Sequence, residues 1–385
     1  MVKKFGGSSV SSLDKIKKIA KKICDNIDSK KVLVVVSAMG DTTNNLLDMA
    51  SLISKNASKR NLDSLLSIGE QQTASLLAMA IEDLNYKSIS LTGYQCKIKT
   101  DSFYNNASIL DIDTSKILNH FKNNDVLVVT GFQGFDEFDN ITTLGRGGSD
   151  TSAVALAIAL DALYCEIYTD VDGIYSFDPR KIDKAKHISQ ISYDEALEMA
   201  YCGAKVLHDR CVKLASYNNL KIYVKSTFDD RKFTLVSGGD NMEKFKVKGI
   251  AIQDNLVKLN IKYDNLFRLL NFFRDKKINI DNLSTYDSNI SFSLSKECYL
   301  EVEDELNLFL DNIDVVYDLV KVSIIGFGIN ENLDITNKIL TELKNYDIHL
   351  LSSSACRYSF LIDEDSSLQI AQLLHSNLVE SQIVA

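Results

Sequence analysis

The sequence predicts an α/β protein with a mainly parallel sheet, followed by two smaller units of the α+β type. Three observations support this fold class. Short β-branched runs recur before residue 230 and alternate with segments of helical period. The pattern changes after a small polar stretch at residues 237–241, which is typical of a linker. Beyond this stretch, one order of strands and helices occurs twice, at a period of about 75 residues.

In the first part of the chain, apolar strands are followed by helical segments. Strands are predicted at residues 1–4, 31–38, 88–91, 126–131, 165–169 and 221–224. Helices are predicted at residues 13–23, 65–83, 153–162 and 193–216. Strands that are buried on both faces and alternate with helices form parallel sheets, whose ligands bind at the C-terminal ends of the strands. We therefore expect a binding site in the loops that follow these strands.

The last part of the chain repeats a βαββα order. Its first copy has predicted strands at residues 247–253 and 256–263, a helix at 266–276 and strands at 278–283 and 290–294. Its second copy has a strand at residues 321–325, a helix at 333–345, strands at 348–352 and 358–362 and a helix at 367–377. This order predicts two ferredoxin-like units, with the boundary between them near residue 300.

Composition and charge exclude several classes of protein. The chain has 385 residues, enough for two or three domains. Its formal net charge of -9 gives no global basic surface for nucleic acid or anionic membranes. No apolar run approaches the roughly 20 residues that span a bilayer, and the N-terminus does not resemble a signal peptide. The 7 cysteines form no C-x-x-C pair, which argues against a zinc site or a disulfide framework. We expect a cytoplasmic protein with no nucleic-acid or membrane partner and no metal site of its own.

A pair of glycines follows the first predicted strand, in the segment Lys4–Val10. Two glycines, Gly6 and Gly7, allow the backbone to close on a phosphate, while Lys4 supplies a positive charge. The segment is not a Walker A loop, because Lys4 precedes the glycines and no Gly-Lys-Ser/Thr follows. The alternative is a tight turn at the end of a strand.

Three glycines surround Arg146 in the segment Thr142–Ser152, which runs directly into an alanine-rich apolar helix. Ser149 or Asp150 is expected to cap this helix at its N-terminus. A guanidinium can bind a carboxylate through two hydrogen bonds, and the helix N-terminus can hold a second anionic group. The alternative is a helix cap beside a solvent-exposed arginine.

An acidic, aromatic loop follows the predicted strand at residues 165–169. In the segment Tyr168–Arg180, Gly173 stands at the fourth position rather than the sixth and no closing glutamate follows, so the segment is not an EF-hand loop. A loop of this kind suits a nucleoside, with Arg180 reaching a phosphate. The alternative is an ordered turn.

Together, six segments resemble the aspartate kinases of the amino-acid kinase family in order and spacing over essentially the whole chain: Lys4–Val10, Val36–Thr43, Gly131–Gly134, Thr142–Ala159, Tyr168–Arg180 and Gly203–His208. The resemblance implies an α/β/α sandwich kinase domain at residues 1–240 and tandem ACT domains at 245–385. It implies ATP-dependent phosphorylation of the L-aspartate side chain to 4-phospho-L-aspartate, which leads to lysine, threonine, methionine and diaminopimelate.

The resemblance also assigns roles to single residues. Lys4 stabilises the transferred phosphoryl group and Asp150 orients the site. The residues implied to bind aspartate are Thr43, Glu70, Arg146 and Ser149. The residues implied to bind ATP are Lys4, Gly6, Gly7, Ser8, Thr169, Asp170, Tyr175, Arg180 and Lys205. Mg²⁺ is expected to arrive with ATP, and the implied partners are an amino-acid effector at the ACT domains and a homodimer or higher assembly.

The sequence departs from the family pattern mainly in its C-terminal part. The loops at residues 263–266 and 331–334 lack the usual glycine, and Ala355 replaces the usual glutamate. In addition, Asp209 replaces the usual proline after His208. These departures predict weakened or altered feedback inhibition. Two alternatives remain open: another amino-acid kinase, such as a glutamate or uridylate kinase, and a catalytically inactive regulator that binds amino acids.

Overall fold

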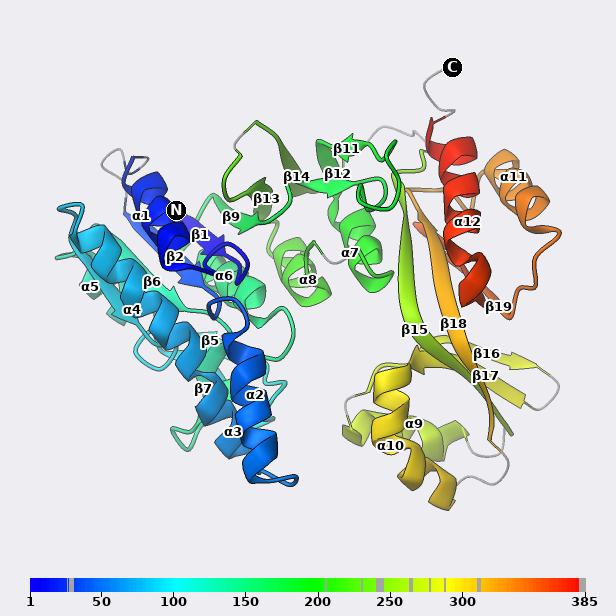
Figure 1. Ribbon diagram of the computed structural model, residues 1–385, viewed down its shortest axis with the longest axis horizontal. Coiled ribbons are helices and arrows are strands. Elements are labelled where there is room, and N and C mark those ends of the chain that lie inside the picture. Colours follow the sequence, from blue (N-terminus) through cyan, green and yellow to red (C-terminus); the bar gives the residue numbers. More distant parts are fainter. Residues whose placement is uncertain are drawn as a thin grey trace. The chain divides into compact units, whose positions relative to one another are not determined.

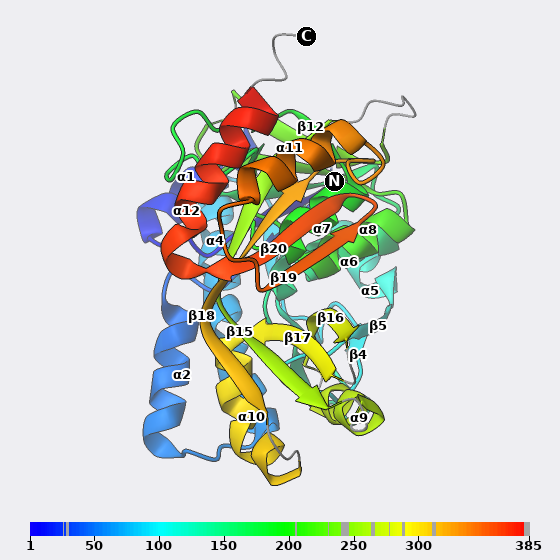
Figure 2. The ribbon, with the colours of Figure 1, turned by 90° about the vertical axis from the view of Figure 1, so that its right-hand side faces the viewer.

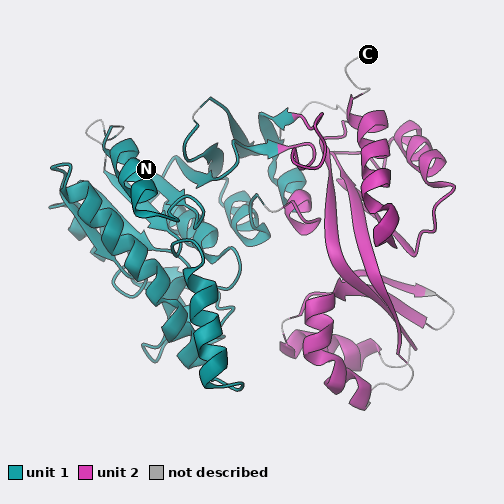
Figure 3. Cartoon of the chain, in the orientation of Figure 1, with its two compact units in different colours: residues 1–174, 187–197, 205–240 teal, residues 175–186, 198–204, 241–385 magenta. Residues whose placement is uncertain are grey.

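The computed structural model describes residues 1–25, 27, 31–204, 206–229, 231–239, 246–262, 266–276, 278–286, 289–309 and 313–380 (Figure 1). The chain divides into two compact units (Figure 3). The first unit comprises residues 1–174, 187–197 and 205–240, and the second comprises residues 175–186, 198–204 and 241–385.

An eight-stranded sheet forms the centre of the first unit, in the order β12-β14-β13-β9-β1-β2-β6-β3. Its strands are β1 (Val2–Phe5), β2 (Val32–Val36), β3 (Ser88–Leu91), β6 (Val126–Thr130), β9 (Tyr164–Thr169), β12 (Gln190–Ser192), β13 (Lys221–Ser226) and β14 (Phe233–Ser237). Among the pairings that the described residues form in this sheet, only that of β13 with β14 is antiparallel. The prediction of a mainly parallel sheet is confirmed.

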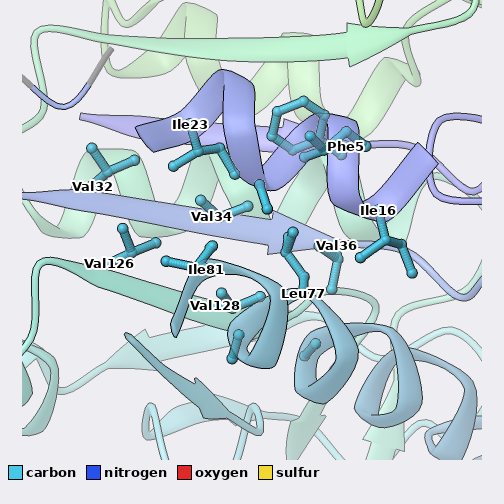
Figure 4. Close-up of a cluster of buried hydrophobic side chains, with 14 of the residues drawn as sticks. Phe5, Ile16, Ile23, Val32, Val34, Val36, Leu77, Ile81, Val126 and Val128 are labelled. Carbon is cyan, nitrogen blue, oxygen red and sulfur yellow. The ribbon is translucent and has the colours of Figure 1, made fainter. Parts of the chain in front are cut away.

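Helices cover both faces of this sheet. One face packs against α1 (Leu13–Cys24) and α4 (Ile68–Glu82), and Figure 4 shows their side chains meeting those of β1, β2 and β6. Lys4 points to the opposite face, where α6 (Gly148–Ala159) lies and α8 (Asp209–Tyr217) packs against α6. Both faces of β2 are buried, so its sequence shows no alternation of polar and apolar residues and is a continuous run of valine and leucine. The expected α/β/α sandwich is therefore present.

Sequence patterns missed most of the remaining elements of the first part. A four-stranded sheet is formed by β4 (Ile98–Thr100), β5 (Ile109–Ile112), β7 (Gln133–Phe135) and β8 (Ile141–Thr143). The other elements are α2 (Thr42–Ile53), α3 (Lys59–Leu66), α5 (Thr114–Phe121), α7 (Tyr193–Tyr201), β10 (Ile174–Tyr175) and β11 (His187–Ile188). The predicted helix at 65–83 begins earlier and divides at Ser67 into α3 and α4, and the one at 193–216 is two helices, α7 and α8.

The second unit contains a six-stranded antiparallel sheet in the order β16-β17-β15-β18-β20-β19. Its strands are β15 (Gly249–Lys262), β16 (Asp281–Tyr286), β17 (Asn289–Ser295), β18 (Asp314–Ile325), β19 (Leu350–Ser354) and β20 (Arg357–Asp363). Its helices are α9 (Leu266–Lys276), α10 (Lys296–Phe309), α11 (Leu333–Leu343) and α12 (Glu364–His375), followed by the π-helical turn η2 (Ser376–Glu380).

Two long strands run through both halves of this sheet. The predicted strands at 247–253 and 256–263 form one strand, β15, with a change of register between Gln253 and Leu256. Figures 1 and 2 show β15 beside β18, with α9 and α10 near one end and α11 and α12 near the other. The expected boundary near residue 300 falls inside α10. Each half has its own apolar cluster, but both halves use β15.

The segment at residues 175–186 belongs to the second unit because it packs under α12. Phe177 and Ile182 join the apolar cluster of α11 and α12. Ser176 Oγ accepts the Lys186 N–H at 2.8 Å, so its own proton can be donated to His375 Nε2 at 2.9 Å. His375 is fully buried, and burial lowers the pKa of its imidazole.

Among the described residues, no helix combines the length and the apolar character that crossing a membrane requires.

The core between α4 and the central sheet predicts a large cost for removing one side chain. Leu77 of α4 is fully buried, whereas Leu52 of α2 is 85% exposed. We expect Leu77→Ala to lower the free energy of unfolding of the first unit by about 2–5 kcal/mol. Leu52→Ala removes the same atoms from a helix surface and should change it by less than about 0.5 kcal/mol. Urea denaturation of the two variants measures both values, and equal values would contradict the packing.

Candidate active site

A buried ion pair joins the central strand to helix α6. Lys4 lies on β1, where its neighbours in register are Val35 of β2 and Ile167 of β9. Its Nζ atom lies 2.5 Å from Asp150 Oδ1, in the first turn of α6. Because an isolated charge is costly to bury, Asp150 is what allows a lysine at this position.

The glycine pair after β1 is packed against the backbone on both sides. The Gly6 N–H donates to the Tyr168 carbonyl at 3.2 Å, and a Cβ atom on Gly7 would lie 2.9 Å from the Ala38 carbonyl oxygen. Ser8 is exposed at the tip of the loop, where the Lys15 ammonium donates to its carbonyl at 2.9 Å. The loop therefore presents backbone groups beside two lysines, Lys4 and Lys15, which suits an anion.

Helix α6 begins at Gly148, earlier in the chain than a cap at Ser149 or Asp150 would allow. Its N-cap is Gly147, with φ of 68°, so the expectation that Ser149 or Asp150 caps the helix is wrong. A Cβ atom on Gly147 would lie 2.1 Å from His208 Cγ, so only glycine fits this left-handed turn. Asp150 instead lies within the first turn, where the helix dipole favours its negative charge. Ser149 is buried beside Gly131.

Glu70 is a buried carboxylate with one oxygen left unbonded among the described residues. It lies in the first turn of α4, and its Oε1 accepts the Ala38 N–H at 2.9 Å. Its Oε2 is buried and accepts no hydrogen bond in the part of the chain that the structure describes. Burial raises the pKa of Glu70 to about 7. A buried acceptor without a donor fits a cationic ligand group. The Ala38 peptide contacts both Glu70 and Gly7, so the two features are neighbours.

The other expected aspartate-binding residues lie on loops and helix starts. Thr43 is half-buried in the first turn of α2, and Arg146 is exposed between β8 and α6. Asp209, which replaces the usual proline, lies with its carboxylate 2.8 Å from His208 Nδ1. His208 in turn lies against Gly147, so this pair supports the turn that starts α6.

Beyond the glycine loop and Lys4, the expected ATP-binding residues fall into three groups. Thr169 ends β9 and donates to the Asp170 carboxylate at 2.9 Å. Tyr175 and Arg180 belong to the second compact unit, where Arg180 forms an ion pair with Asp178 at 2.9 Å. Lys205 lies outside the described residues.

Sequence reasoning missed a second set of buried charges on the other face of the sheet. The Glu166 carboxylate lies 3.4 Å from Lys3 Nζ and 2.5 Å from Lys225 Nζ. Burial lowers the pKa of Lys3, while the two lysines hold the pKa of Glu166 below its ordinary value despite its burial. Charged residues inside otherwise apolar strands were the signal that could have revealed this network.

Two further residues, Asp63 and Arg210, hold the loop before α6 and were also missed. Asp63 is fully buried and accepts hydrogen bonds from Asn105 and Thr143. Arg210 donates to the carbonyl groups of Leu144 and Ala107. No local pattern reveals them, because their partners lie far away in the sequence. Within the described residues, no group of three or more His, Cys, Asp or Glu side chains is placed to hold a metal ion.

Comparisons with known proteins agree with this arrangement. The profile of the amino acid kinase family matches residues 1–226. The aspartokinase of Geobacillus stearothermophilus is 39% identical over 391 residues, which cover 97% of this chain and 96% of that protein.

Solved structures show the same fold. E. coli aspartokinase III in complex with aspartate and ADP (R-state) is 24% identical, with a TM-score of 0.84, covering 98% of this chain and 99% of that one. The same enzyme in complex with lysine and aspartate (T-state) gives a TM-score of 0.72 at the same identity and coverage. Given the family profile, and above all the near full-length relative at 39% identity, this chain belongs to the amino acid kinase family and, within it, to the aspartokinases.

Proposed function

We propose that this chain uses ATP to phosphorylate the side-chain carboxylate of L-aspartate, giving 4-phospho-L-aspartate for the biosynthesis of lysine, threonine, methionine and diaminopimelate in the cytoplasm. The observation that carries the proposal is Glu70, a buried carboxylate beside the glycine loop of Lys4, with one oxygen that accepts no hydrogen bond from the described residues. Such an oxygen suits the ammonium group of an amino acid. The glycine loop suits the phosphates of a nucleotide.

Each end of aspartate has a proposed partner. Glu70 binds the ammonium group, and the Arg146 guanidinium binds a carboxylate through two hydrogen bonds. Thr43 and Ser149 fix the orientation of the substrate. The acceptor carboxylate is already ionised at neutral pH, so the reaction needs no general base.

On the nucleotide side, Lys4 stabilises the negative charge of the transferred phosphoryl group, and Asp150 holds the Lys4 ammonium in place. Gly6, Gly7 and Ser8 lie against the phosphates. Thr169, Asp170, Tyr175, Arg180 and Lys205 are assigned to ATP from their motifs. Mg²⁺ bound to the ATP phosphates would supply further neutralising charge.

Two other functions compete with this proposal: another amino-acid kinase and an inactive regulator. A coupled assay of ADP release with aspartate, glutamate and nucleoside monophosphates distinguishes them. We expect turnover with aspartate only. No preference for aspartate would reject aspartate as the substrate, and no turnover with any acceptor would favour the inactive regulator.

We further propose a kinase domain at residues 1–240 and tandem ACT domains at residues 245–385. We also propose that the protein forms a homodimer or a higher assembly, and light scattering on the purified protein tests this assembly.

Removing the Lys4 ammonium should abolish turnover. We expect Lys4→Ala to lower kcat by about 10³-fold, because it removes a preorganised positive charge from the transition state. Lys17→Ala, which removes an exposed lysine from α1, is the control and should leave kcat unchanged. Near-UV circular dichroism establishes that both variants are folded. A folded Lys4→Ala protein with normal turnover would contradict the assigned role.

The raised pKa of Glu70 predicts how aspartate binding depends on pH. Burial holds this carboxyl protonated below about pH 7, and only the ionised form attracts an ammonium group. The KM for aspartate should therefore fall about tenfold per pH unit up to pH 7 and level off above it. Glu70→Gln should raise this KM and remove its pH dependence. Initial rates between pH 6 and 8 test this, and a flat profile in the unmodified protein would rule out the role of Glu70.

The second ACT loop predicts weak feedback inhibition. The loop at residues 331–334 lacks the glycine that family members usually have, and the Asn332 side chain accepts the N–H groups of Asp334 and Ile335 at the start of α11. The N–H groups of Asp334 and Ile335 therefore already have a hydrogen-bond acceptor within the protein. The first ACT loop, at residues 263–265, lies outside the described residues.

We expect lysine and threonine to inhibit less than is usual for the family, and Asn332→Gly to increase the inhibition. Asn332→Ala removes the cap without introducing a glycine into the loop and is the control. Activity titrations with each amino acid measure the effect. Strong inhibition of the unmodified protein would contradict the hypothesis.

A further inference from the structure

Residues 175–186 form a short arm that belongs to the second unit, although the chain on either side of it belongs to the first (Figure 3). Two of the residues assigned to ATP, Tyr175 and Arg180, lie in this arm. Tyr175 is at its base, in β10, and Arg180 is paired with Asp178 near its tip. The contacts that hold the arm therefore bear on both residues.

Ser176, next to Tyr175, holds the base of the arm. Its N–H donates to the Lys186 carbonyl at 2.8 Å, and its Oγ accepts the Lys186 N–H at 2.8 Å. Its carbonyl accepts the N–H of Ile250 in β15 at 2.7 Å. Its hydroxyl proton is left for His375 Nε2, which lies 2.9 Å away at the end of α12. The backbone next to Tyr175 is therefore fixed to both β15 and α12.

His375 is a polar side chain inside an apolar cluster. It is fully buried, and the Phe177 ring packs edge-on against it with 6.4 Å between the ring centroids. Burial lowers the pKa of its imidazole, which favours the neutral form with one acceptor nitrogen. Nε2 is the acceptor that faces Ser176, and this assigns the proton to Nδ1, which lies 3.4 Å from Glu380 Oε1. The imidazole therefore connects the arm to the turn after α12.

That turn, η2, holds the other end of the arm. The Lys186 ammonium donates to the Val379 carbonyl at 2.8 Å, and the Lys184 ammonium lies 3.2 Å from Glu380 Oε2. One apolar cluster includes side chains of both segments, namely Phe177 and Ile182 of the arm and Leu378 and Val379 of η2. The arm is thus held at its base and along its returning half by the last elements of the described chain.

We propose that His375, acting through Ser176, is a positioning residue that holds the arm in the conformation that binds ATP. This inference rests on the proposed function, in which Tyr175 and Arg180 bind ATP. A small displacement of a positioned group is enough to weaken binding markedly. Loosening the arm should spare aspartate, because the residues assigned to aspartate all lie in the first unit: Thr43, Glu70, Arg146 and Ser149.

The experiment compares His375→Leu with His375→Gln in the full chain, using the ADP-release assay. Leucine fills the apolar site but can bond neither Ser176 nor Glu380, whereas the glutamine amide reaches about as far as Nε2 and can still accept the Ser176 hydroxyl. We expect His375→Leu to raise the KM for ATP about tenfold and to change the KM for aspartate less than about twofold. His375→Gln should stay within about threefold of the unmodified protein in both values.

Tyr358→Phe is the matched control for a purely structural role. The Tyr358 hydroxyl bonds to that of Thr336 at 2.9 Å, and its ring packs against the same apolar cluster as His375. The phenylalanine variant therefore loses a hydrogen bond between β20 and α11 while the bonds between the arm and α12 remain. It should leave both KM values unchanged.

Hydrogen exchange followed by mass spectrometry gives a readout that does not depend on turnover. The amides of residues 175–186 should exchange faster in His375→Leu than in the unmodified protein, because fewer contacts hold the arm closed. In Tyr358→Phe they should exchange at the unmodified rate. Faster exchange without a change in the KM for ATP would contradict the positioning role.

A second pair of variants covers the case in which His375→Leu does not fold. Lys186→Met removes the ammonium that bonds Val379 from a half-buried position, and Lys186→Arg keeps a donor there. The methionine variant should raise the KM for ATP about threefold, and the arginine variant should restore it.

Three results would overturn the inference: an unchanged KM for ATP in folded His375→Leu or Lys186→Met, an equal rise in the KM for aspartate, or an equal effect of Tyr358→Phe. An absence of ATP-dependent turnover in the unmodified protein would instead overturn the proposed function.

Discussion

The buried positive charge of Lys4 on the central strand is the constraint on which the arrangement of the first unit depends. Its neighbours in the sheet, Val35 and Ile167, are apolar, so the charge has to be neutralised from another layer. Asp150 can do so only if the first turn of α6 lies directly against β1. That placement requires a sharp left-handed turn before the helix, which Gly147 provides and His208 packs against. One ion pair thus fixes the strand, the helix and the loop between them.

Two buried carboxylates show how the same chemical group serves two purposes. Asp63 has hydrogen bonds to both of its oxygens, and its partners are all part of the protein. Glu70 has one oxygen bonded to Ala38 and the other unbonded in the described part of the chain. Burial raises the pKa of both groups. The difference in bonding, rather than in burial, separates a residue that holds the fold from one that is open to a ligand.

The sequence predicted those features of the fold that depend on local composition. The β-branched runs located the inner strands because strands buried on both faces have no polar positions, as in β2. The strands β4, β7 and β8 were missed because three residues are too few to show a period. The break at Ser67 and the cap at Gly147 depend on contacts with distant segments, which composition does not reveal. Local motifs pointed to Lys4, Glu70 and Asp150 as candidate site residues. Asp63 was found only in the structure, because its partner Thr143 is 80 residues away in the sequence.

The contact between Ser176 and His375 has a consequence for the synthesis of the protein. The two residues are 199 positions apart, so the segment at 175–186 leaves the ribosome long before α12 exists. At roughly 5–20 residues per second, its partner follows about 10–40 s later. During that time Phe177 and Ile182 lack the apolar cluster that buries them in the finished chain. Until α12 has been synthesised, the nascent chain therefore carries these two apolar side chains without the cluster that buries them.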